Sequence, residues 1–309
     1  MRVRYRLVAA AAVCALVPTG LLLASTSAQA ATPFPAHYSA PYLQIAGSDA
    51  GDMAADMKAS GDKYYTLAFL TPKSGCTPEW EDGGDSVGAF TSQINALRAA
   101  GGDVIISFGG EAGGELAQTC TSVSNLTAAY KKVVDTYRVT RLDFDIEGSV
   151  LDNTTANNRR DQALAMVQAK YPQVHIDFTV PVDPTGLENN ALNLLKGAKS
   201  KGVKVTIVNI MTMDFGNGQN ALADAESAAK ATHGQLASIY GGSSASIWGM
   251  LGLTPIAGHN DDNENFTQSN AKTLESFAAS NGVGELSFWE VDGYDKGTGY
   301  AYSKIFNKI

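Results

Sequence analysis

The stretch Thr140-Arg141-Leu142-Asp143-Phe144-Asp145-Ile146-Glu147 carries three carboxylates at alternate positions, each preceded by a large apolar residue. Because side chains alternate between the two faces of a β-strand, Asp143, Asp145 and Glu147 are expected to point to one face and the apolar residues to the other. Neighbouring carboxylates on a buried strand repel one another and lose hydration. A chain accepts this arrangement mainly where it needs shifted pKa values or a bound cation. The stretch therefore predicts a functional site at the end of a buried strand.

Apolar, β-rich runs recur along the whole chain and alternate with segments of helical periodicity. Several runs are almost continuously hydrophobic, as in parallel strands that are covered on both faces. We expect eight strands, at residues 42–45, 64–70, 104–108, 141–147, 175–180, 203–213, 246–253 and 285–290. We expect helices between them at residues 87–100, 123–137, 157–170, 191–201, 219–239 and 268–279.

Eight such units predict an α/β fold, a parallel eight-stranded (β/α)8 TIM barrel. No linker or low-complexity tail is visible, so residues 31–309 are expected to form a single domain. The segment 258–268 is short, which leaves little room for a large insertion domain. The alternative is a doubly wound open sheet. That fold favours a Gly-rich turn after an early strand, whereas the Gly-rich segment 109–114 follows the third strand and lacks the G-x-G-x-x-G spacing.

The first thirty residues have the pattern of a secretory signal peptide. Three arginines lie among the first six residues, an apolar run follows at residues 7–24, and Ala28-Gln29-Ala30 is a small-residue cleavage site. A retained membrane anchor is the alternative, and no second apolar run is long enough to span a bilayer. We therefore expect residues 1–30 to be removed and the protein to be secreted and extracellular.

The remaining chain is acidic, with 20 basic and 31 acidic residues and a net charge of −11. A field of this sign repels nucleic acid and anionic membranes. We therefore expect neither nucleic acid nor a membrane as a partner, and we expect a monomer.

Cys76 and Cys120 are the two cysteines that remain once Cys14 leaves with the signal. An even pair in an oxidising compartment favours a disulfide, and both lie in expected loops after successive strands. Two free thiols are the alternative. The cysteine spacing matches no zinc signature, and the four histidines are scattered, so no metal site is expected from them.

The three alternating acids suggest acid–base chemistry. In a (β/α)8 barrel the active site lies at the C-terminal ends of the strands, so Glu147 is expected at the mouth, with Asp145 and Asp143 successively deeper. The deep pair can share a proton, because two close carboxylates do not easily both ionise. Glu147 can then act as a general acid with a raised pKa. A site for Ca²⁺ or Mg²⁺, bound through carboxylate oxygens, is the alternative.

Two motifs in the sequence resemble signatures of family 18 of the glycoside hydrolases, the chitinase family. Residues 140–147 resemble its D-x-x-D-x-D-x-E signature, with Thr140 in place of the first acid. Ser107-Phe108-Gly109-Gly110, at the end of the third strand, resembles its S-x-G-G signature. Gly109 and Gly110 allow close backbone packing beneath the sugar site, and Ser107 can hydrogen-bond the buried aspartate.

The sixth and eighth strands extend the resemblance. Residues 211–214 resemble the M-x-Y-D segment, in which Tyr and Asp contact the substrate. Asp214 matches, whereas Met213 stands where the family has the tyrosine. Trp289 fits the hydrophobic floor that the family places under the reacting sugar. Tyr42, on the first strand, is expected to line the pocket. These residues and the S-x-G-G residues are the expected substrate-binding set.

The resemblance implies a secreted chitinase that hydrolyses β-1,4-linked N-acetylglucosamine polymers with retention of configuration. The acetamido oxygen of the substrate itself acts as the nucleophile. Glu147 protonates the leaving oxygen and then deprotonates water, Asp145 hydrogen-bonds the acetamido N–H, and Asp143 holds and tunes Asp145. The implied partners are chitin and chito-oligosaccharides, and the reaction requires no cofactor and no metal.

Two other functions stay open at this point. A non-catalytic sugar-binding lectin on the same barrel would fit the departure at Met213. An endo-β-N-acetylglucosaminidase acting on glycans would use the same chemistry. The short segment 258–268 predicts a shallow, open cleft and endo-type cleavage. Trp80, in an expected loop, is interpreted as a sugar-binding residue, and Trp248, in an expected strand, as part of the core.

Overall fold

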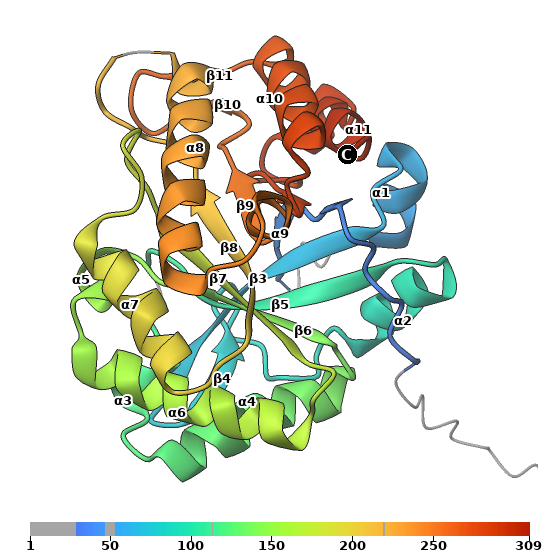
Figure 1. Ribbon diagram of the computed structural model, residues 1–309. Helices are drawn as coiled ribbons and strands as arrows, with labels where there is room; N and C mark the ends of the chain where they lie inside the picture. Colours follow the sequence, from blue (N-terminus) through green and yellow to red (C-terminus); the bar gives the residue numbers. More distant parts are fainter. Residues whose placement is uncertain (1–28, 47–52, 113, 219) are drawn as a thin grey trace, which may run out of the picture.

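The computed structural model describes residues 29–46, 53–112, 114–218 and 220–309 (Figure 1). Nearly all of the expected signal peptide lies outside these residues. Within the described ranges, no helix is both long and apolar enough to cross a membrane.

The parallel sheet closes into a barrel with eight positions. In spatial order it contains β3 (Tyr64–Ser74), β5 (Asp103–Gly109), β6 (Arg141–Asp145), β7 (His175–Pro181), β8 (Val205–Met211), β9 (Leu251–Thr254) and β12 (Glu285–Leu286). Two short strands close the ring, because β1 (Tyr38–Ser39) pairs with β12 and β2 (Tyr42–Gln44) pairs with β3. The predicted (β/α)8 fold is confirmed. The remaining strand beside it, β4 (Thr77–Trp80), folds back antiparallel onto β3.

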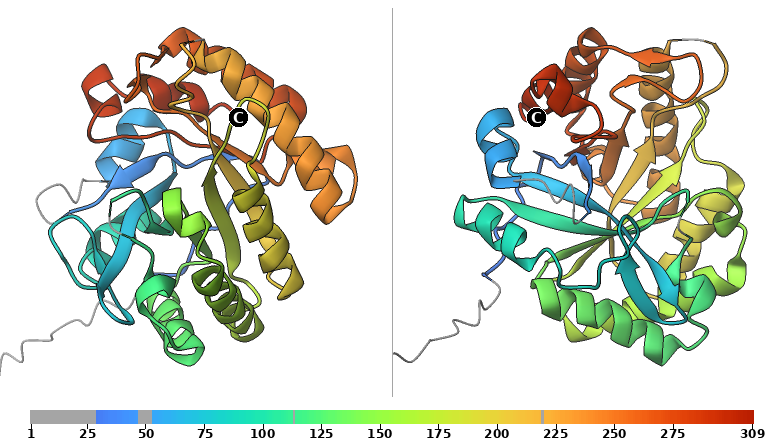
Figure 2. Two further views of the ribbon diagram at one scale, coloured as in Figure 1. Left: turned by 90° about the vertical axis from the view of Figure 1, so that its left-hand side faces the viewer. Right: turned by 180° about the vertical axis from the view of Figure 1, so that it is seen from behind.

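The helices lie around the outside of the strands (Figures 1 and 2). They are α1 (Met53–Ser60), α2 (Thr91–Ala99), α3 (Leu116–Thr119), α4 (Val123–Tyr137), α5 (Gly148–Leu151), α6 (Thr154–Lys170), α7 (Asn189–Ser200), α8 (Ala221–Tyr240), α9 (Ser244–Trp248), α10 (Gln268–Asn281) and α11 (Ala301–Phe306), with a short 3₁₀ helix at Asp295–Thr298. A small hairpin of β10 (Gly258–His259) and β11 (Asn265–Phe266) lies between β9 and α10.

Local signals set the ends of several helices. Ser122 caps α4 by accepting a hydrogen bond from the Asn125 N–H, and Asn153 caps α6 by accepting one from the Ala156 N–H. Gly282 ends α10 with φ of 76°, a left-handed conformation in which glycine meets no steric penalty. These contacts fix where α4 and α6 begin and where α10 ends.

The two faces of β6 meet different surroundings, as the alternation predicts. Leu142, Phe144 and Ile146 are fully buried in the apolar layer between sheet and helices. The Phe144 ring stacks on Phe108 of β5, with ring centroids 5.2 Å apart. The charged residues of β6 point into the barrel instead, so the strand divides its side chains between the core and the site.

An ionic cluster fills the base of the barrel. The Arg141 guanidinium donates to both carboxylate oxygens of Asp177, at 2.9 and 3.1 Å. Tyr38 donates its hydroxyl proton to Glu285 at 2.8 Å, and burial raises the pKa of Glu285 to about 8. The rings of Phe34 and Tyr38 each lie 5.1 Å from the Arg141 guanidinium. This cluster, defined by Arg141, Asp177, Glu285 and Tyr38, is here called the basal cluster.

The predicted disulfide is present. Cys76 in the β3–β4 turn is bonded to Cys120 after α3, with their Cα atoms 4.4 Å apart. The bond joins the segments that follow β3 and β5, which are neighbours in the barrel. This brings the two cysteines close enough to form a disulfide.

Two local predictions are wrong. Residues 246–253 form the end of α9 and then β9 rather than one strand, because Ser243 caps a short helix by accepting a hydrogen bond from the Ser246 N–H. Trp248 therefore lies on a helix, where its ring stacks on His233 at the edge of the core. Trp80 belongs to β4 and is completely buried, with its indole N–H donated to the Tyr137 hydroxyl at 2.9 Å, so it does not offer a face to a sugar.

Candidate active site

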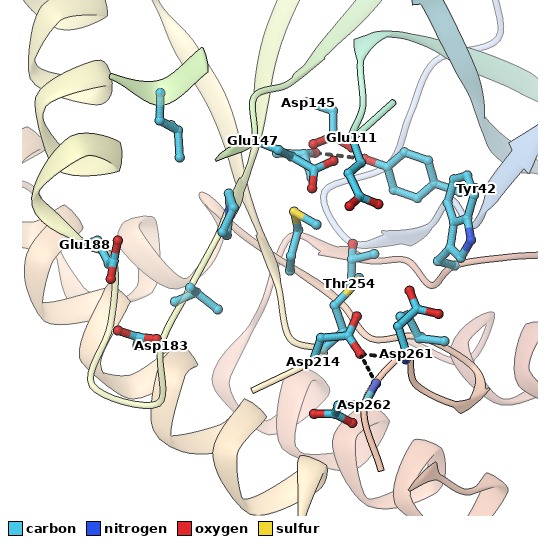
Figure 3. A pocket seen from close by; sticks show the side chains of 18 of the residues that line it. Tyr42, Glu111, Asp145, Glu147, Asp183, Glu188, Asp214, Thr254, Asp261 and Asp262 are labelled. Carbon is cyan, nitrogen blue, oxygen red and sulfur yellow. Dashed lines mark hydrogen bonds between the residues drawn. The ribbon is translucent and has the colours of Figure 1, made fainter. Parts of the chain in front are cut away.

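A cavity of about 750 Å³ opens at the carboxyl ends of the strands (Figure 3). Its volume lies in the range of ligand-binding pockets. Six of the expected site residues line it: Tyr42, Asp145, Glu147, Met213, Asp214 and Trp289. The other expected residues, Ser107, Gly109, Gly110 and Asp143, do not line it. The remaining lining residues are Phe69, Glu111, Leu151, Thr179, Pro181, Val182, Asp183, Glu188, Asn190, Met211, Thr254, Ile256, Asp261 and Asp262.

Asp143 is held by three hydroxyl groups. It accepts hydrogen bonds from Ser107 at 2.6 Å, from Thr179 at 2.8 Å and from Tyr42 at 3.2 Å. Burial raises the pKa of Asp143 to about 7, although the hydroxyl donors act in the opposite direction. Asp143 is thus fixed beside Asp145, in a position from which it can orient its neighbour.

Gly109 and Gly110 let β5 approach the site closely. Their φ angles are 106° and 82°, where side chains are strained. A Cβ on Gly109 would lie 2.0 Å from the carbonyl oxygen of Asp145, and a Cβ on Gly110 would lie 2.6 Å from the Phe69 ring. The two glycines therefore do not contact the cavity themselves. They leave the space that Asp145 and Phe69 need in order to line it.

Asp145 and Glu147 form a hydrogen-bonded carboxylate pair at the cavity wall. Burial, and then the charges of Glu147 and Asp143, raise the pKa of Asp145 well above its ordinary value. Burial also raises the pKa of Glu147. The sequence suggested that Asp143 and Asp145 share a proton. In the structure the Asp145 side chain is hydrogen-bonded to Glu147, whereas Asp143 accepts hydrogen bonds from the hydroxyl groups of Ser107 and Thr179.

Glu111 is a site residue that the sequence reasoning missed. It follows Gly110 at the end of β5, lines the cavity, and raises the pKa of Glu147 through its charge. The available signal was its place, directly after the strand beside β6 in the barrel. In the part of the chain that the structure describes, no group of three or more His, Cys, Asp or Glu side chains is arranged to hold a metal ion.

Aromatic rings form the floor of the cavity. Trp289 lies nearly parallel to Phe69, at an interplanar angle of 8° with centroids 5.7 Å apart, and its ring is 5.8 Å from that of Tyr42. Phe69, on β3, was not predicted. The peptide bonds that precede Phe69 and follow Trp289 are cis. A flat indole face of this kind suits the apolar face of a sugar ring.

A chain of hydrogen bonds crosses four neighbouring strands beneath the cavity. Thr254 on β9 donates to Asn209 on β8 at 2.7 Å, and Asn209 donates to Thr179 on β7 at 3.1 Å. Thr179 donates in turn to Asp143 on β6. The chain links Thr254 and Thr179, which line the cavity, to Asp143 and helps to fix the orientation of that carboxylate.

Asp214 has a clear structural role. Its φ of 48° is left-handed, and its Oδ1 accepts hydrogen bonds from the backbone N–H groups of Asp261 at 2.7 Å and Asp262 at 3.2 Å. Its own N–H donates to the Asn260 side chain at 3.1 Å. Asp214 therefore clamps the β10–β11 turn against the cavity. Met213 lines the cavity with a thioether, which supplies no hydrogen-bond donor.

The comparison with solved structures decides the family. The catalytic domain of a hyperthermophilic chitinase from Pyrococcus furiosus is 35% identical, with a TM-score of 0.82, and the match covers 90% of this chain and 96% of that one. The present chain belongs to the chitinases, family 18 of the glycoside hydrolases. Catalytic-site mutants of active domain 2 of a thermostable chitinase from Pyrococcus furiosus, 35% identical with a TM-score of 0.83, have been solved in complex with chito-oligosaccharides. A family GH18 chitinase from Chromobacterium violaceum, 17% identical with a TM-score of 0.65, shares the fold.

Two curated relatives of this chain are longer proteins, and the chain matches only part of each. A probable bifunctional chitinase/lysozyme of Escherichia coli is 36% identical over 280 residues, which are 84% of this chain and 31% of that protein. Endochitinase 11 of Metarhizium anisopliae is 36% identical over 274 residues, which are 84% of this chain and 52% of that protein. The chain thus spans about a third to a half of these relatives. No family model matches it.

Proposed function

We propose that this protein hydrolyses the β-1,4 linkages between N-acetylglucosamine units of chitin and chito-oligosaccharides, with retention of configuration. The observation that carries the proposal is that the buried pair of Asp145 and Glu147 lines the same cavity as the Trp289 ring. The chito-oligosaccharides bound by the Pyrococcus mutants support the choice of substrate.

Substrate binding prepares the carboxylate pair. The acetamido N–H of the sugar above Trp289 donates to Asp145, whose Oδ1 is buried and has no hydrogen-bond partner among the described residues. A donor at Asp145 favours its anionic form, so a proton held between Asp145 and Glu147 moves to Glu147 when the substrate binds. Glu147 is then the protonated general acid, and Asp143 keeps Asp145 aligned through the hydroxyl contacts below it.

The first step breaks the glycosidic bond. Glu147 donates its proton to the glycosidic oxygen while the acetamido oxygen attacks the anomeric carbon, and the leaving chain departs with that proton. The sugar is left as a cyclic oxazolinium ion, whose positive charge the anionic Asp145 stabilises. In the second step Glu147 takes a proton from water as the water oxygen attacks the anomeric carbon. The ring opens to the acetamido group, and each bond cleaved consumes one water molecule.

The site of action and the cleavage pattern follow from the same proposal. A signal peptide at residues 1–30 would export the enzyme to the extracellular space. Between β9 and α10 the described chain carries only the small β10–β11 hairpin, so this side of the cavity has no large inserted wall. An open cavity admits the interior of a polymer, which favours endo-type cleavage.

Product analysis tests the proposed function. The protein should cleave an N-acetylglucosamine hexamer to shorter oligomers, and proton NMR should show β-anomers first. A cellulose hexamer of the same length should stay intact because it lacks the acetamido nucleophile. Binding of the chitin hexamer without cleavage would favour the lectin alternative, and cleavage of the cellulose hexamer would contradict the substrate-assisted reaction.

A further inference from the structure

Glu290 directly follows Trp289, the aromatic residue on the floor of the cavity, but does not line the cavity itself. Its side chain is partly buried, and this burial raises the pKa of the carboxyl group, while the Gln44 N–H acts in the opposite direction. No ion pair in the described part of the chain includes Glu290. A carboxylate that is partly removed from water and has no cation depends on hydrogen-bond donors for its stability.

The backbone at Trp289 bulges where it meets β2. On the side of β9, the Trp289 N–H donates to the Pro255 carbonyl at 3.0 Å. On the side of β2, the Tyr42 N–H donates to the Phe288 carbonyl at 3.0 Å, and the Tyr42 carbonyl accepts from the Val291 N–H at 3.0 Å. Two residues therefore lie between the partners of Tyr42, whereas a regular parallel ladder has one. An extra residue of this kind re-aims a side chain and interrupts the pairing of the strand.

The Glu290 carboxylate takes the place of the strand partner that the bulge removes. The Gln44 N–H, two residues beyond Tyr42 on β2, donates to Glu290 Oε2 at 3.1 Å. The backbone carbonyl of Glu290 accepts instead from the Asp295 N–H at 3.2 Å. The Gly293 N–H also donates to the Glu290 carboxylate. Because a partly buried backbone N–H requires an acceptor, the side chain completes the contact between β2 and the segment that carries Trp289.

We propose that Glu290 is a positioning residue, whose carboxylate ties the bulged segment to β2 and so holds the Trp289 indole in its place against Phe69 and Tyr42. The indole lies 8° from parallel to the Phe69 ring, and its centroid is 5.8 Å from that of Tyr42. This inference rests on the proposed function, in which a sugar stacks on Trp289. A stacking contact is made with the bound substrate and the transition state alike, so its loss should raise KM more than it lowers kcat.

Kinetics on the N-acetylglucosamine hexamer test the positioning role. Glu290→Ala should raise KM by about twofold to tenfold, the equivalent of one typical hydrogen bond, and change kcat by less than about twofold. Glu290→Gln keeps an acceptor oxygen and should restore most of the wild-type KM. Gly293→Ala would place a Cβ 2.5 Å from Glu290 Oε1, so it should displace the carboxylate and raise KM without removing the charge. Glu275→Ala on α10, which does not line the cavity, is the matched control.

Fluorine NMR of protein labelled with fluorotryptophan separates positioning from a general loss of stability. The chain has three tryptophans, and Trp289→Phe assigns the resonance of Trp289. Glu290→Ala should shift or broaden this resonance and leave those of Trp80 and Trp248 in place. A Trp289 resonance or a KM that Glu290→Ala leaves unchanged, or a KM that Glu290→Gln does not restore, would overturn the inference. Failure of the wild type to cleave the hexamer would overturn the proposed function instead, and the spectra, which need no substrate, would still report on Glu290.

Discussion

The segment from Arg141 to Glu147, which contains β6, carries charged residues at both ends of the barrel, and the two ends differ in their partners. At the base, Arg141 pairs with Asp177 at 2.9 Å, and a pKa of about 8 keeps Glu285 protonated at neutral pH. The basal cluster is therefore close to neutral. At the mouth, Asp145 and Glu147 take part in none of the ion pairs among the described residues, and both have raised pKa values.

The difference shows that residues close together in the sequence can have different roles, with a stabilising ion pair at the base and reactive carboxylates at the mouth. Buried charges that are paired contribute little to reactivity, whereas breaking such a pair leaves an isolated buried charge. Carboxylates without a cation instead hold a proton at a pH where an ordinary carboxyl group has lost it. We therefore expect changes at the base to affect stability and changes at the mouth to affect turnover.

The largest effect on turnover short of removing the general acid is expected from Asp145→Asn. The acetamido group would lose its anionic acceptor and the oxazolinium ion its counter-charge, so kcat should fall by about 10²–10³-fold. Thermal unfolding should show no loss of stability, because the substitution removes a buried carboxyl group that no cation pairs with among the described residues. A variant with the kcat of the wild type and a lowered Tm would show that Asp145 contributes to stability and not to turnover.

Arg141→Gln tests the base of the barrel. Removing one partner of a buried ion pair should lower the free energy of unfolding by about 3–5 kcal/mol, as measured by urea titration. The kcat of the folded fraction should change little, since Arg141 does not line the cavity. A large loss of kcat in a variant of normal stability would contradict the separation. The double variant Arg141→Gln with Asp177→Asn should recover part of the stability.

Ser107→Ala lies between the two regions and should have a smaller effect. It removes the shortest of the hydroxyl contacts to Asp143, so stability should fall by about 1–3 kcal/mol. Because Ser107 lowers the pKa of Asp143, its removal should raise that pKa further. NMR titration of the carboxyl carbons measures the change, and an unaltered pKa would show that Asp143 is tuned by its burial alone.

The smallest predicted effect is a shift of the pH profile in Glu111→Gln. The Glu111 charge raises the pKa of Glu147, so its removal should lower that pKa. The general acid would then lose its proton at a lower pH, and the alkaline limb of kcat/KM on the neutral hexamer should move down by less than about 1 pH unit. The same limb measured in Glu275→Gln is the control. A shift to higher pH would contradict the assignment of Glu147 as the acid.

The barrel and its β6 motif were predictable because their signals are local. Alternation alone separates Leu142 and Phe144 from Asp143 and Asp145, and the structure follows it. The hydrophobic runs likewise predict where most barrel strands lie, because this signal does not depend on which strands pair with each other. The positions of Asp145, Glu147 and Trp289 on the cavity follow from the rule that strand ends gather at one face of a barrel.

Features that depend on tertiary contacts were not predictable in this way. Trp80 seemed available in a polar loop, but β4 folds back onto β3 and buries it. The clamp role of Asp214 requires the β10–β11 turn, which is more than forty residues away in the sequence. The hydrogen bonds of Asp143 likewise depend on the hydroxyl donors that Ser107 and Thr179 bring from neighbouring strands.

Turnover of Glu147→Gln tests the central claim most directly. Glutamine keeps the shape of the side chain but has no carboxyl proton to give, so kcat on the N-acetylglucosamine hexamer should fall by about 10²–10⁴-fold or more. Calorimetry should show the hexamer still bound, and thermal unfolding should show a protein at least as stable as the wild type. Turnover close to that of the wild type would contradict the assignment of Glu147 as the acid and base of this site.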